Sequence, residues 1–474
     1  MIKQWQAISL WKRVLIGLVI GMIIGVGLHY GLPESADATK TDALSADATI
    51  TGAQIAGAQS ADATITDAQA ADPTITGAQI ANDWIFPFGD AFVRLIKMLV
   101  IPLIATTLVA GVTAMGDPRK LGSLGFRTLS MYLLTTFFAV SLGLIMGTII
   151  QPGKGASYSD ANEKAKEAVE AKIEASGEIS ITNQLLEIIP TNPIAALAET
   201  KVLPTIFFAI MLGIGILLAG KSGEPIKLFF EAAAEVVMKV TILVMELAPF
   251  GVLALMAWVL ATKGFGVIAN MGKLALALYL CCFLQIVIVY AGLIVKGILR
   301  LPLMPFIRGI ADAQSLAFST SSSSATLPAT ISCAEKNLGI DKSVAGSVLP
   351  LGATINMDGT AIYLGLIALF AAQAIGIELT LADYFNVALT ATLVSIGAAG
   401  IPSAGLLLAA TVLGVIGVED QDALLVIAFI FPFDRLLDMM RTVTNVTGDL
   451  AVACTVAKWD GMLDEEVYKK VDLV

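Results

Sequence analysis

Long apolar runs recur along almost the whole chain, separated by short polar or charged connections. All but the first exceed the roughly 20 residues that a helix needs to cross a bilayer. This pattern predicts an all-α polytopic membrane protein with eight transmembrane helices. The predicted helices cover residues 14–32, 84–115, 127–151, 184–219, 224–262, 264–298, 341–373 and 420–457. The sequence PTNP at 190–193 interrupts the fourth and predicts a kink.

Two further apolar stretches, 301–337 and 384–417, are interrupted at their middles by FSTSSSSATLP and SIGAAGIPSAG. Each half is too short to span a membrane. Basic residues flank the first stretch and acidic residues flank the second, which places their ends on opposite sides. We therefore expect two re-entrant helical hairpins in inverted orientation, with tips near the membrane centre, as in transporter binding sites. The alternative is two ordinary turns between full spans.

Composition supports one integral-membrane unit. Hydrophobic residues make up 57% of the 474 residues and charged residues only 14%, against roughly 25% in soluble proteins. The four cysteines lie in apolar surroundings without metal-ligand spacing, so we interpret them as core residues: Cys281, Cys282, Cys333 and Cys454. The single histidine, His29, argues against zinc or histidine acid–base chemistry.

Charge placement predicts the orientation. Lysine and arginine cluster before the first helix and after the second, sixth and eighth, so both termini are expected in the cytoplasm. An acidic insert, 33–83, is expected outside the membrane on the other face. Within it, residues 36–82 repeat with a period of five and resemble a pentapeptide repeat, but the centre position is alanine. A flexible segment is favoured over a small solenoid.

Polar and charged residues form a stripe within the last predicted helix. At about 100° per residue, the stripe falls within an arc of roughly 100°. Its members are Asp434, Asp438, Arg441, Thr442, Asn445 and Asp449. A charge at the centre of a membrane helix costs on the order of 2.5–3.5 kcal/mol, so the stripe must face protein, water or a ligand. The alternative is a structural Asp438–Arg441 ion pair that locks two helices.

The seventh predicted helix contains a second polar segment, LPLGATINMDGTA, at 349–361. Its carbonyl, amide, hydroxyl and carboxylate oxygens suit a hard cation, and Asp358 supplies the charge. The alternative is a kink with a buried, protonated Asp358.

Four motifs, SSSSATLP, GATINMDGTA, SIGAAGIPSAG and LDMMRTVTNVTGD, together resemble the dicarboxylate/amino acid:cation symporter family, which includes the excitatory amino acid transporters and an archaeal glutamate transporter homologue. The resemblance implies a homotrimer. Helices 1, 2, 4 and 5, within 1–126 and 184–262, would form a scaffold. Helix 3 (127–153) and residues 264–458 would form a transport domain that moves like an elevator, with the second hairpin as outer gate.

The resemblance also implies a substrate site. Arg441 would bind the side-chain carboxylate of an acidic amino acid and Asp438 its amino group. Asn445 and the backbone of the first hairpin would bind the α-carboxylate. The hairpin residues and those completing the pocket are Ser321, Ser322, Ser323, Thr360, Ile401, Gly405 and Thr442. Retention of Asp438 favours an amino acid over a dicarboxylate, and Arg441 favours aspartate or glutamate over neutral amino acids.

Sodium sites are implied in the same way. Asp449 and Asp358 match one pattern together with Asn445 and carbonyls of Gly352 and Asn356. Two further patterns comprise Tyr132, Thr135 and Thr136 with Asp358, and the carbonyls of Thr354, Ser395, Ile396 and Ala398. Proton-coupled members resemble this chain but have asparagine in place of Asp449, so sodium is favoured. The chain departs from the family at Ser321 and Met439, because relatives carry an arginine at one or the other.

These features predict a symporter that imports L-aspartate or L-glutamate with sodium through a bacterial inner membrane. We expect the lipid bilayer and the amino acid as its partners, with no organic cofactor, catalytic residue or nucleic acid. A proton-coupled glutamate/aspartate or C4-dicarboxylate symporter is the alternative within the fold. A ligand-gated anion channel is the alternative from another class. An enzyme is disfavoured because the serine cluster lacks a histidine partner.

Overall fold

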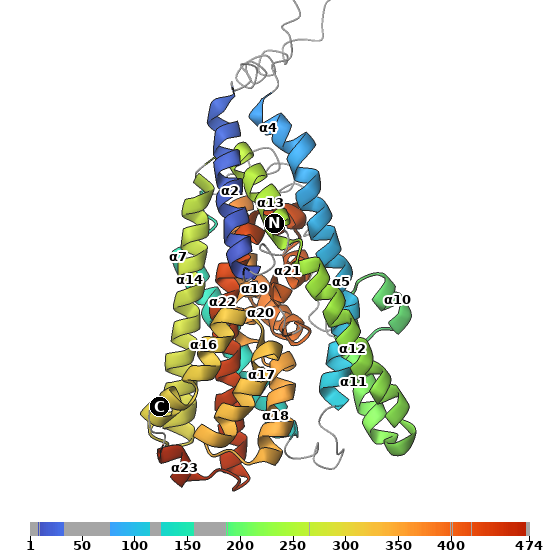
Figure 1. Ribbon diagram of the computed structural model, residues 1–474, viewed down its shortest axis with the longest axis vertical. Helices are drawn as coiled ribbons and strands as arrows, with labels where there is room; N and C mark the ends of the chain where they lie inside the picture. Colours follow the sequence, from blue (N-terminus) through green and yellow to red (C-terminus); the bar gives the residue numbers. More distant parts are fainter. Residues whose placement is uncertain are drawn as a thin grey trace, which may run out of the picture.

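The computed structural model describes residues 8, 10–32, 76–113, 125–155, 186, 188–264, 266–398, 400, 402–418 and 420–470. In these residues the chain forms helices, joined by turns and by an isolated bridge between Ile340 and Leu463. The helices run mostly along the long axis of the molecule (Figure 1). The prediction of an all-helical chain is confirmed for this part.

Most predicted spans correspond to one helix or to two consecutive helices. They are α2 (Leu10–Gly31), α5 (Phe86–Thr113), α7 (Phe126–Ile150), α11 (Val202–Leu218), α12 (Glu224–Met245) with α13 (Ala248–Lys263), α14 (Gly266–Leu284) with the π-helix η4 (Gln285–Ile298), α18 (Lys342–Ile355) with α19 (Asp358–Ile375), and α22 (Asp420–Trp459). In the described part, five spans are long and apolar enough to cross a membrane, and the bent pair α12–α13 makes a sixth. The protein is therefore a multi-pass membrane protein, and the eight-span topology stays a prediction.

Both predicted hairpins fold as a helix, a turn and a second helix that packs on the first. The first comprises α16 (Ala311–Thr320) and α17 (Ser323–Ser332), flanked by α15 (Leu303–Gly309) and η5 (Cys333–Asn337). The second comprises α20 (Leu381–Ile396) and α21 (Ala404–Val415). The chain therefore reverses at the two places that the sequence predicted.

The prediction of a kinked helix over 184–219 is wrong, because the chain starts a new helix there. The Asn192 side chain accepts hydrogen bonds from the N–H groups of Ile194 and Ala195, and Pro193 occupies the first turn of α10 (Pro193–Ala198). The chain then turns through Thr200, whose φ is 56°, before α11 begins. The helix predicted over 224–262 is also divided, since α12 and α13 meet at 47°.

The acidic insert lies largely outside the described residues, and its repeat is not described before Thr76. Residues 77–82 are helical, although the sequence placed them in the insert. Thr76 and Gln79 form a capping box at the start of α4 (Gly77–Ile80), which continues through η1 (Ala81–Ile85) into α5. The second membrane helix therefore begins several residues earlier than predicted.

Helices α2 and α13 pack through a stripe of small residues on α2. A Cβ atom at Gly17, Gly21 or Gly25 would overlap the backbone of α13, so only glycine permits this close approach. Such small-residue stripes favour helix pairing in membranes through van der Waals contact.

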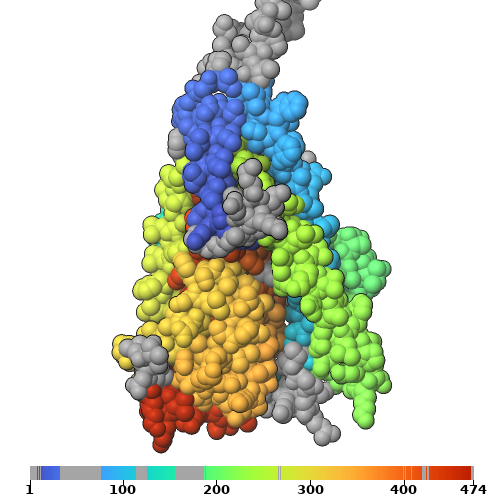
Figure 2. Space-filling view, in the orientation of Figure 1, coloured from blue at the N-terminus to red at the C-terminus, as the bar shows by residue number. Residues whose placement is uncertain are grey.

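The helices pack in two groups. In one group α2 packs on α13, and α5 packs on α11, α12 and α13. In the other, α7 packs on α14, α19 and α20, and α22 packs on both hairpins. The groups meet where α13 touches α22, α11 touches α20, and α5 touches α18 and α21. In Figures 1 and 2, α12 projects at one side of the molecule.

Apolar helices differ in how far the protein itself covers them. In α18–α19 the whole apolar window is buried, whereas only 28% of the window in α2 is buried. Helix α12 exposes large apolar side chains, among them Phe229, Val236 and Leu243. Uncovered apolar surface of this kind suits lipid or another subunit. Helices α18, α19 and α22, which the rest of the protein covers, thus form the centre of the molecule.

The four cysteines are free and buried, as predicted.

We expect Gly21→Leu to destabilise the protein, because a larger side chain must force α2 away from the α13 backbone. Overpacking of this kind costs roughly 1–3 kcal/mol. The matched control is Gly27→Leu in the same helix, since nothing lies within 4 Å of a Cβ added at Gly27. Thermal melting of the detergent-solubilised variants, monitored by size-exclusion chromatography, should give a lower melting temperature for Gly21→Leu than for Gly27→Leu. Equal melting temperatures would contradict this packing.

Candidate functional site

The polar stripe of α22 is buried inside the protein. All six members are at most 5% exposed: Asp434, Asp438, Arg441, Thr442, Asn445 and Asp449. The stripe faces α18, α19 and the two hairpins, which pack on α22. The helical period thus places these groups on one face, and the surrounding elements exclude lipid from it.

Arg441 lies at the centre of this buried network. Its Nη2 is 3.1 Å from Asp434 Oδ1 and 2.7 Å from Asp438 Oδ1, and the guanidinium carbon lies 3.9 Å from the centroid of the Tyr363 ring. The Tyr363 hydroxyl donates to Asp434 Oδ1 at 2.7 Å. The Asp438–Arg441 ion pair therefore forms within one helix, and Tyr363 of α19 links this network to the neighbouring helix.

The pairing leaves part of Arg441 free. Its Nε and Nη1 are buried and have no hydrogen-bond partner. A guanidinium presents five N–H donors in a planar fork that matches a carboxylate. The arrangement can therefore donate hydrogen bonds to a carboxylate from Nε or from Nη1, donors that the protein does not use.

The tips of the two hairpins touch one another. α16 ends at Thr320, and the next residue, Ser321, has a left-handed backbone with φ 53°. Ser322 caps α17 and donates through Oγ to the Gly400 carbonyl at 2.5 Å, and Ser324 N–H donates to the same oxygen at 3.1 Å. The second tip also reaches α22, because Ser403 N–H donates to Asp438 Oδ2 at 2.7 Å. The hairpins and α22 thus enclose the stripe together.

Most residues of the predicted substrate site lie around this enclosure. A Cβ atom at Gly405 would lie 2.8 Å from Thr360 Cγ2 and 2.9 Å from Arg441 Nη1. Ser321 Oγ is buried without a partner, and Ser323 is buried at the start of α17. Ile401 lies outside the described residues. The Thr442 hydroxyl donates to the Asp438 carbonyl of its own helix at 2.9 Å.

Asp358 lies in a second buried cluster, at the start of α19. Its carboxylate accepts hydrogen bonds from Thr136 Oγ1 at 2.6 Å, Tyr290 Oη at 2.5 Å and Gln285 Nε2 at 3.3 Å. Thr135 Oγ1 lies 3.4 Å from Asn356 Oδ1. Both threonines belong to α7. The buried residues of α7 recur every three or four positions, so they lie on one face, and this face packs on α19. The cluster is rich in oxygen atoms around one carboxylate.

Asp449 and Asn445 connect this cluster to α22. Asn356 Nδ2 donates to Asp449 Oδ1 at 2.9 Å, and Gly359 N–H donates to Asn445 Oδ1 at 2.7 Å. Gly352 lies against both Asp449 and the Tyr132 hydroxyl, which donates to the Val348 carbonyl. The break between α18 and α19 therefore places backbone and side-chain oxygens beside two carboxylates, a set that suits a hard cation.

The third predicted cation set is formed by the ends of two helices. Ser395, Ile396 and Ala398 lie at the end of α20, where Ala398 N–H donates to the Ser395 carbonyl at 2.9 Å. Thr354 lies near the end of α18 and donates to Leu351 in that helix at 3.0 Å. Gly400 of the second hairpin packs against the Ala353 carbonyl, which brings the two helix ends close together.

Sequence reasoning missed four residues of this centre. Gln285 and Tyr290 donate to Asp358 from η4, Tyr363 contacts Arg441 and Asp434, and Arg435 donates to the first hairpin. Gln285 is a single amide within the apolar run CCFLQIVIVYAG, and that isolation is a signal that could have drawn attention to it. Tyr363 gave no comparable signal, since tyrosine is common in apolar helices.

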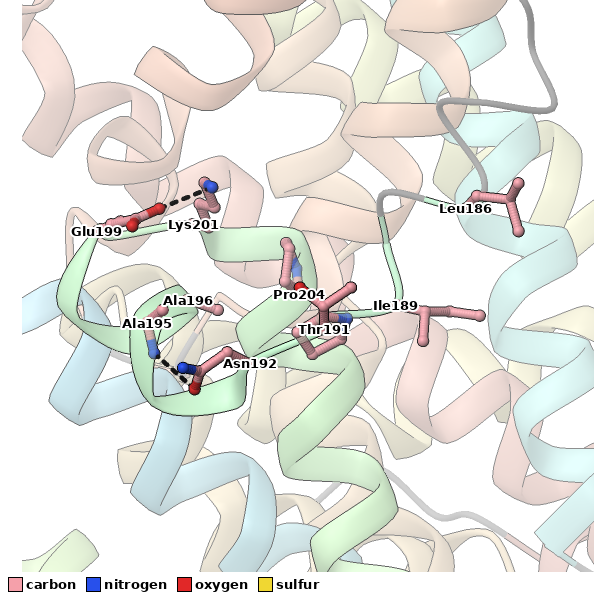
Figure 3. A pocket seen from close by; sticks show the side chains of 10 residues that line it. Leu186, Ile189, Thr191, Asn192, Ala195, Ala196, Glu199, Lys201 and Pro204 are labelled. Atoms are coloured by element: carbon pink, nitrogen blue, oxygen red, sulfur yellow. Dashed lines mark hydrogen bonds and ion pairs between the residues drawn. The ribbon is translucent and has the colours of Figure 1, made fainter.

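A surface hollow near α10 is separate from this centre (Figure 3). It is lined between Leu186 and Pro204, where the Asn192 cap and the Glu199–Lys201 ion pair of 2.7 Å lie. None of the predicted site residues lines it. The hollow belongs to the connection before α11 and is not the candidate site.

Comparison with known proteins identifies the family of the chain. The model of the sodium:dicarboxylate symporter family matches residues 10–459. The chain is 36% identical to the proton/sodium-glutamate symport protein of Bacillus subtilis, over 80% of this chain and 87% of that protein. It is 36% identical to the C4-dicarboxylate transport protein of Azorhizobium caulinodans (80% and 84% covered) and 34% identical to the proton/glutamate-aspartate symporter of Escherichia coli (81% and 89% covered). The chain therefore belongs to the sodium:dicarboxylate symporter family.

Proposed function

We propose that this protein is a sodium-coupled symporter that imports L-aspartate or L-glutamate. The observation that carries the proposal is the pair of buried, unpartnered donors of Arg441, Nε and Nη1, beside Asp438 and the two hairpin tips. Relatives described as glutamate and aspartate symporters support the substrate class.

The charges of the site fit an acidic amino acid. The substrate carries two carboxylates and one ammonium group, and the stripe offers a guanidinium and a carboxylate. On binding, the substrate carboxylate accepts hydrogen bonds from the unused donors of Arg441, and the ammonium pairs with Asp438. A dicarboxylate without an amine would place a further negative charge beside Asp438, which is unfavourable in a buried site.

Sodium is favoured as the coupled ion by the hydrogen bonds around Asp358. Three donors point at its carboxylate, and donors of this kind stabilise the ionised form that a cation requires. Asp449 supplies a second carboxylate on the far side of Asn356. We expect sodium to bind among these oxygens and to order the α18–α19 break and the second hairpin, so that ion and substrate bind cooperatively.

We further propose the arrangement that moves the substrate. α2, α5, α11, α12 and α13 would form the scaffold of a homotrimer, and the remaining helices with both hairpins would slide across it as an elevator. The eight-span topology, cytoplasmic termini and a bacterial inner membrane belong to the same proposal. The two packing groups and the exposed apolar face of α12 are compatible with it.

We expect Arg441→Ala to abolish uptake of labelled L-aspartate by proteoliposomes with an inward sodium gradient. The variant loses charge-assisted hydrogen bonds to the substrate carboxylate, worth roughly 10- to 100-fold in affinity. Arg308→Ala is the control, because Arg308 is exposed on α15. Wild-type uptake that persists at full rate with choline in place of sodium would overturn sodium coupling. Aspartate that equilibrates but never accumulates would indicate a channel.

We expect Asp449→Asn to weaken the dependence of uptake on sodium, because the variant removes one of the two buried charges that attract the ion. The sodium concentration for half-maximal uptake should rise at least about 10-fold. Asp312→Asn, at an exposed position of the first hairpin, should leave it unchanged. Uptake driven by a pH gradient alone would assign the wild-type protein to the proton-coupled alternative instead.

A further inference from the structure

Residues 460–470, which follow α22, form a strap across one end of the molecule. The chain leaves α22 at Trp459, turns through Gly461 with φ 69°, and forms the short helix α23 (Glu465–Lys469). The Asp464 carboxylate caps this helix. In Figure 1, α23 lies at the end of the molecule opposite α4. We call residues 460–470 the C-terminal strap.

The C-terminal strap pairs with the segment that follows the first hairpin, and the two form an antiparallel bridge. Asp464 N–H donates to the Gly339 carbonyl at 2.8 Å. Asp341 N–H donates to the Met462 carbonyl at 3.0 Å. Gly339 has φ 67°, and a Cβ atom there would lie 2.4 Å from the Asp464 carbonyl oxygen. Only glycine therefore permits this contact.

The strap also contacts the segment that precedes the first hairpin. Tyr468 is fully buried, and its hydroxyl donates to the carbonyl of Pro302, directly before α15, at 2.9 Å. Lys458, at the end of α22, donates to the Leu299 carbonyl at 2.8 Å and forms an ion pair of 2.8 Å with Glu465. The buried Tyr468 ring dominates these contacts, because a partly exposed ion pair contributes little. The strap thus ties both ends of the first hairpin to α22.

The base of the first hairpin controls the position of its tip. α16 and α17 are helices of 10 residues each, roughly 15 Å long, and both pack on α22. Their tip meets Gly400 of the second hairpin beside the polar stripe. Because the two helices are short and rigid, a tilt at the base moves the tip away from α22. Contacts that fix the base to α22 therefore also fix the tip over the site.

We propose that the C-terminal strap fastens the base of the first hairpin to α22 and so keeps the substrate site closed on the side of this hairpin during transport. Tyr468 is the main positioning residue, because it joins the strap to the start of the hairpin from a buried position. The role in transport rests on the proposed function, whereas the fastening itself can be measured on the purified protein without any substrate.

The test uses Cys333, a buried thiol at the start of η5, as a native reporter at the base of the hairpin. The full-length protein in detergent reacts with N-ethylmaleimide, and mass spectrometry gives the labelling rate of each cysteine. Tyr468→Ala and Gly339→Ala break the contact from its two sides. Glu466→Gln, on the exposed face of α23, is the control for the first variant. Gly346→Ala is the control for the second, since a Cβ atom there would meet none of the described residues within 4 Å.

We expect Tyr468→Ala and Gly339→Ala each to raise the labelling rate of Cys333 roughly 10-fold or more, because the base of the hairpin then opens locally. Cys281 and Cys282 of α14 should keep their rates, and both controls should match the wild type. An unchanged rate at Cys333 would overturn the inference. Equal increases at all three cysteines would also overturn it, since they indicate general loosening. Tyr468→Phe, which removes only the hydroxyl, replaces Tyr468→Ala if that variant does not elute as a folded protein.

The consequence for transport is measured in proteoliposomes with an inward sodium gradient. Tyr468→Ala should lower the final accumulation of labelled L-aspartate, because a first hairpin that opens lets substrate and ions escape, while the Kd for aspartate changes less than about 3-fold. Unchanged accumulation together with faster labelling of Cys333 would overturn the role in transport. A wild-type protein that accumulates no aspartate would overturn the proposed function instead, and the labelling rates would still decide whether the strap fastens the hairpin.

Discussion

The centre of this protein depends on keeping ionised side chains inside a membrane helix with their charges paired. Arg441 is enclosed by Asp434, Asp438 and the Tyr363 ring, and none of these groups is available to water. An unpaired buried charge costs several kcal/mol, so α19 and α22 must keep their register for the network to survive. The packing around α22 follows from this requirement.

Broken helices are the second consequence of the same environment. Each break releases N–H and C=O groups that lipid cannot satisfy, and they pair across the centre instead. Gly400 accepts from the first hairpin, Ser403 donates to Asp438, and Gly359 donates to Asn445. A carboxylate or ammonium group that enters the site competes for these bonds. The groups that hold the hairpin tips together are therefore those through which a substrate can change their position.

The sequence predicted the features that arise from local chemistry. The stripe on α22 was readable because a helix has a fixed period, and the breaks were readable because serine, glycine and proline interrupt apolar helices. The kink predicted at PTNP was wrong because the side chain of Asn192 caps a new helix there. The presence of two prolines does not distinguish a kink from the start of a new helix. Residues 76–82 were assigned to the insert because the five-residue repeat continues into α4.

Other parts of the site could not be read from the sequence. Gln285 and Tyr290 reach Asp358 from a helix distant in sequence, and Arg435, just outside the arc of the stripe, reaches the first hairpin. By itself, the sequence determined that the chain is a membrane protein with interrupted helices and a buried charged face, because hydropathy and helical period are local properties. Only the tertiary structure decided which donors meet each carboxylate and which guanidinium donors stay unpaired, because pairing of buried charges depends on contacts between helices far apart in the chain.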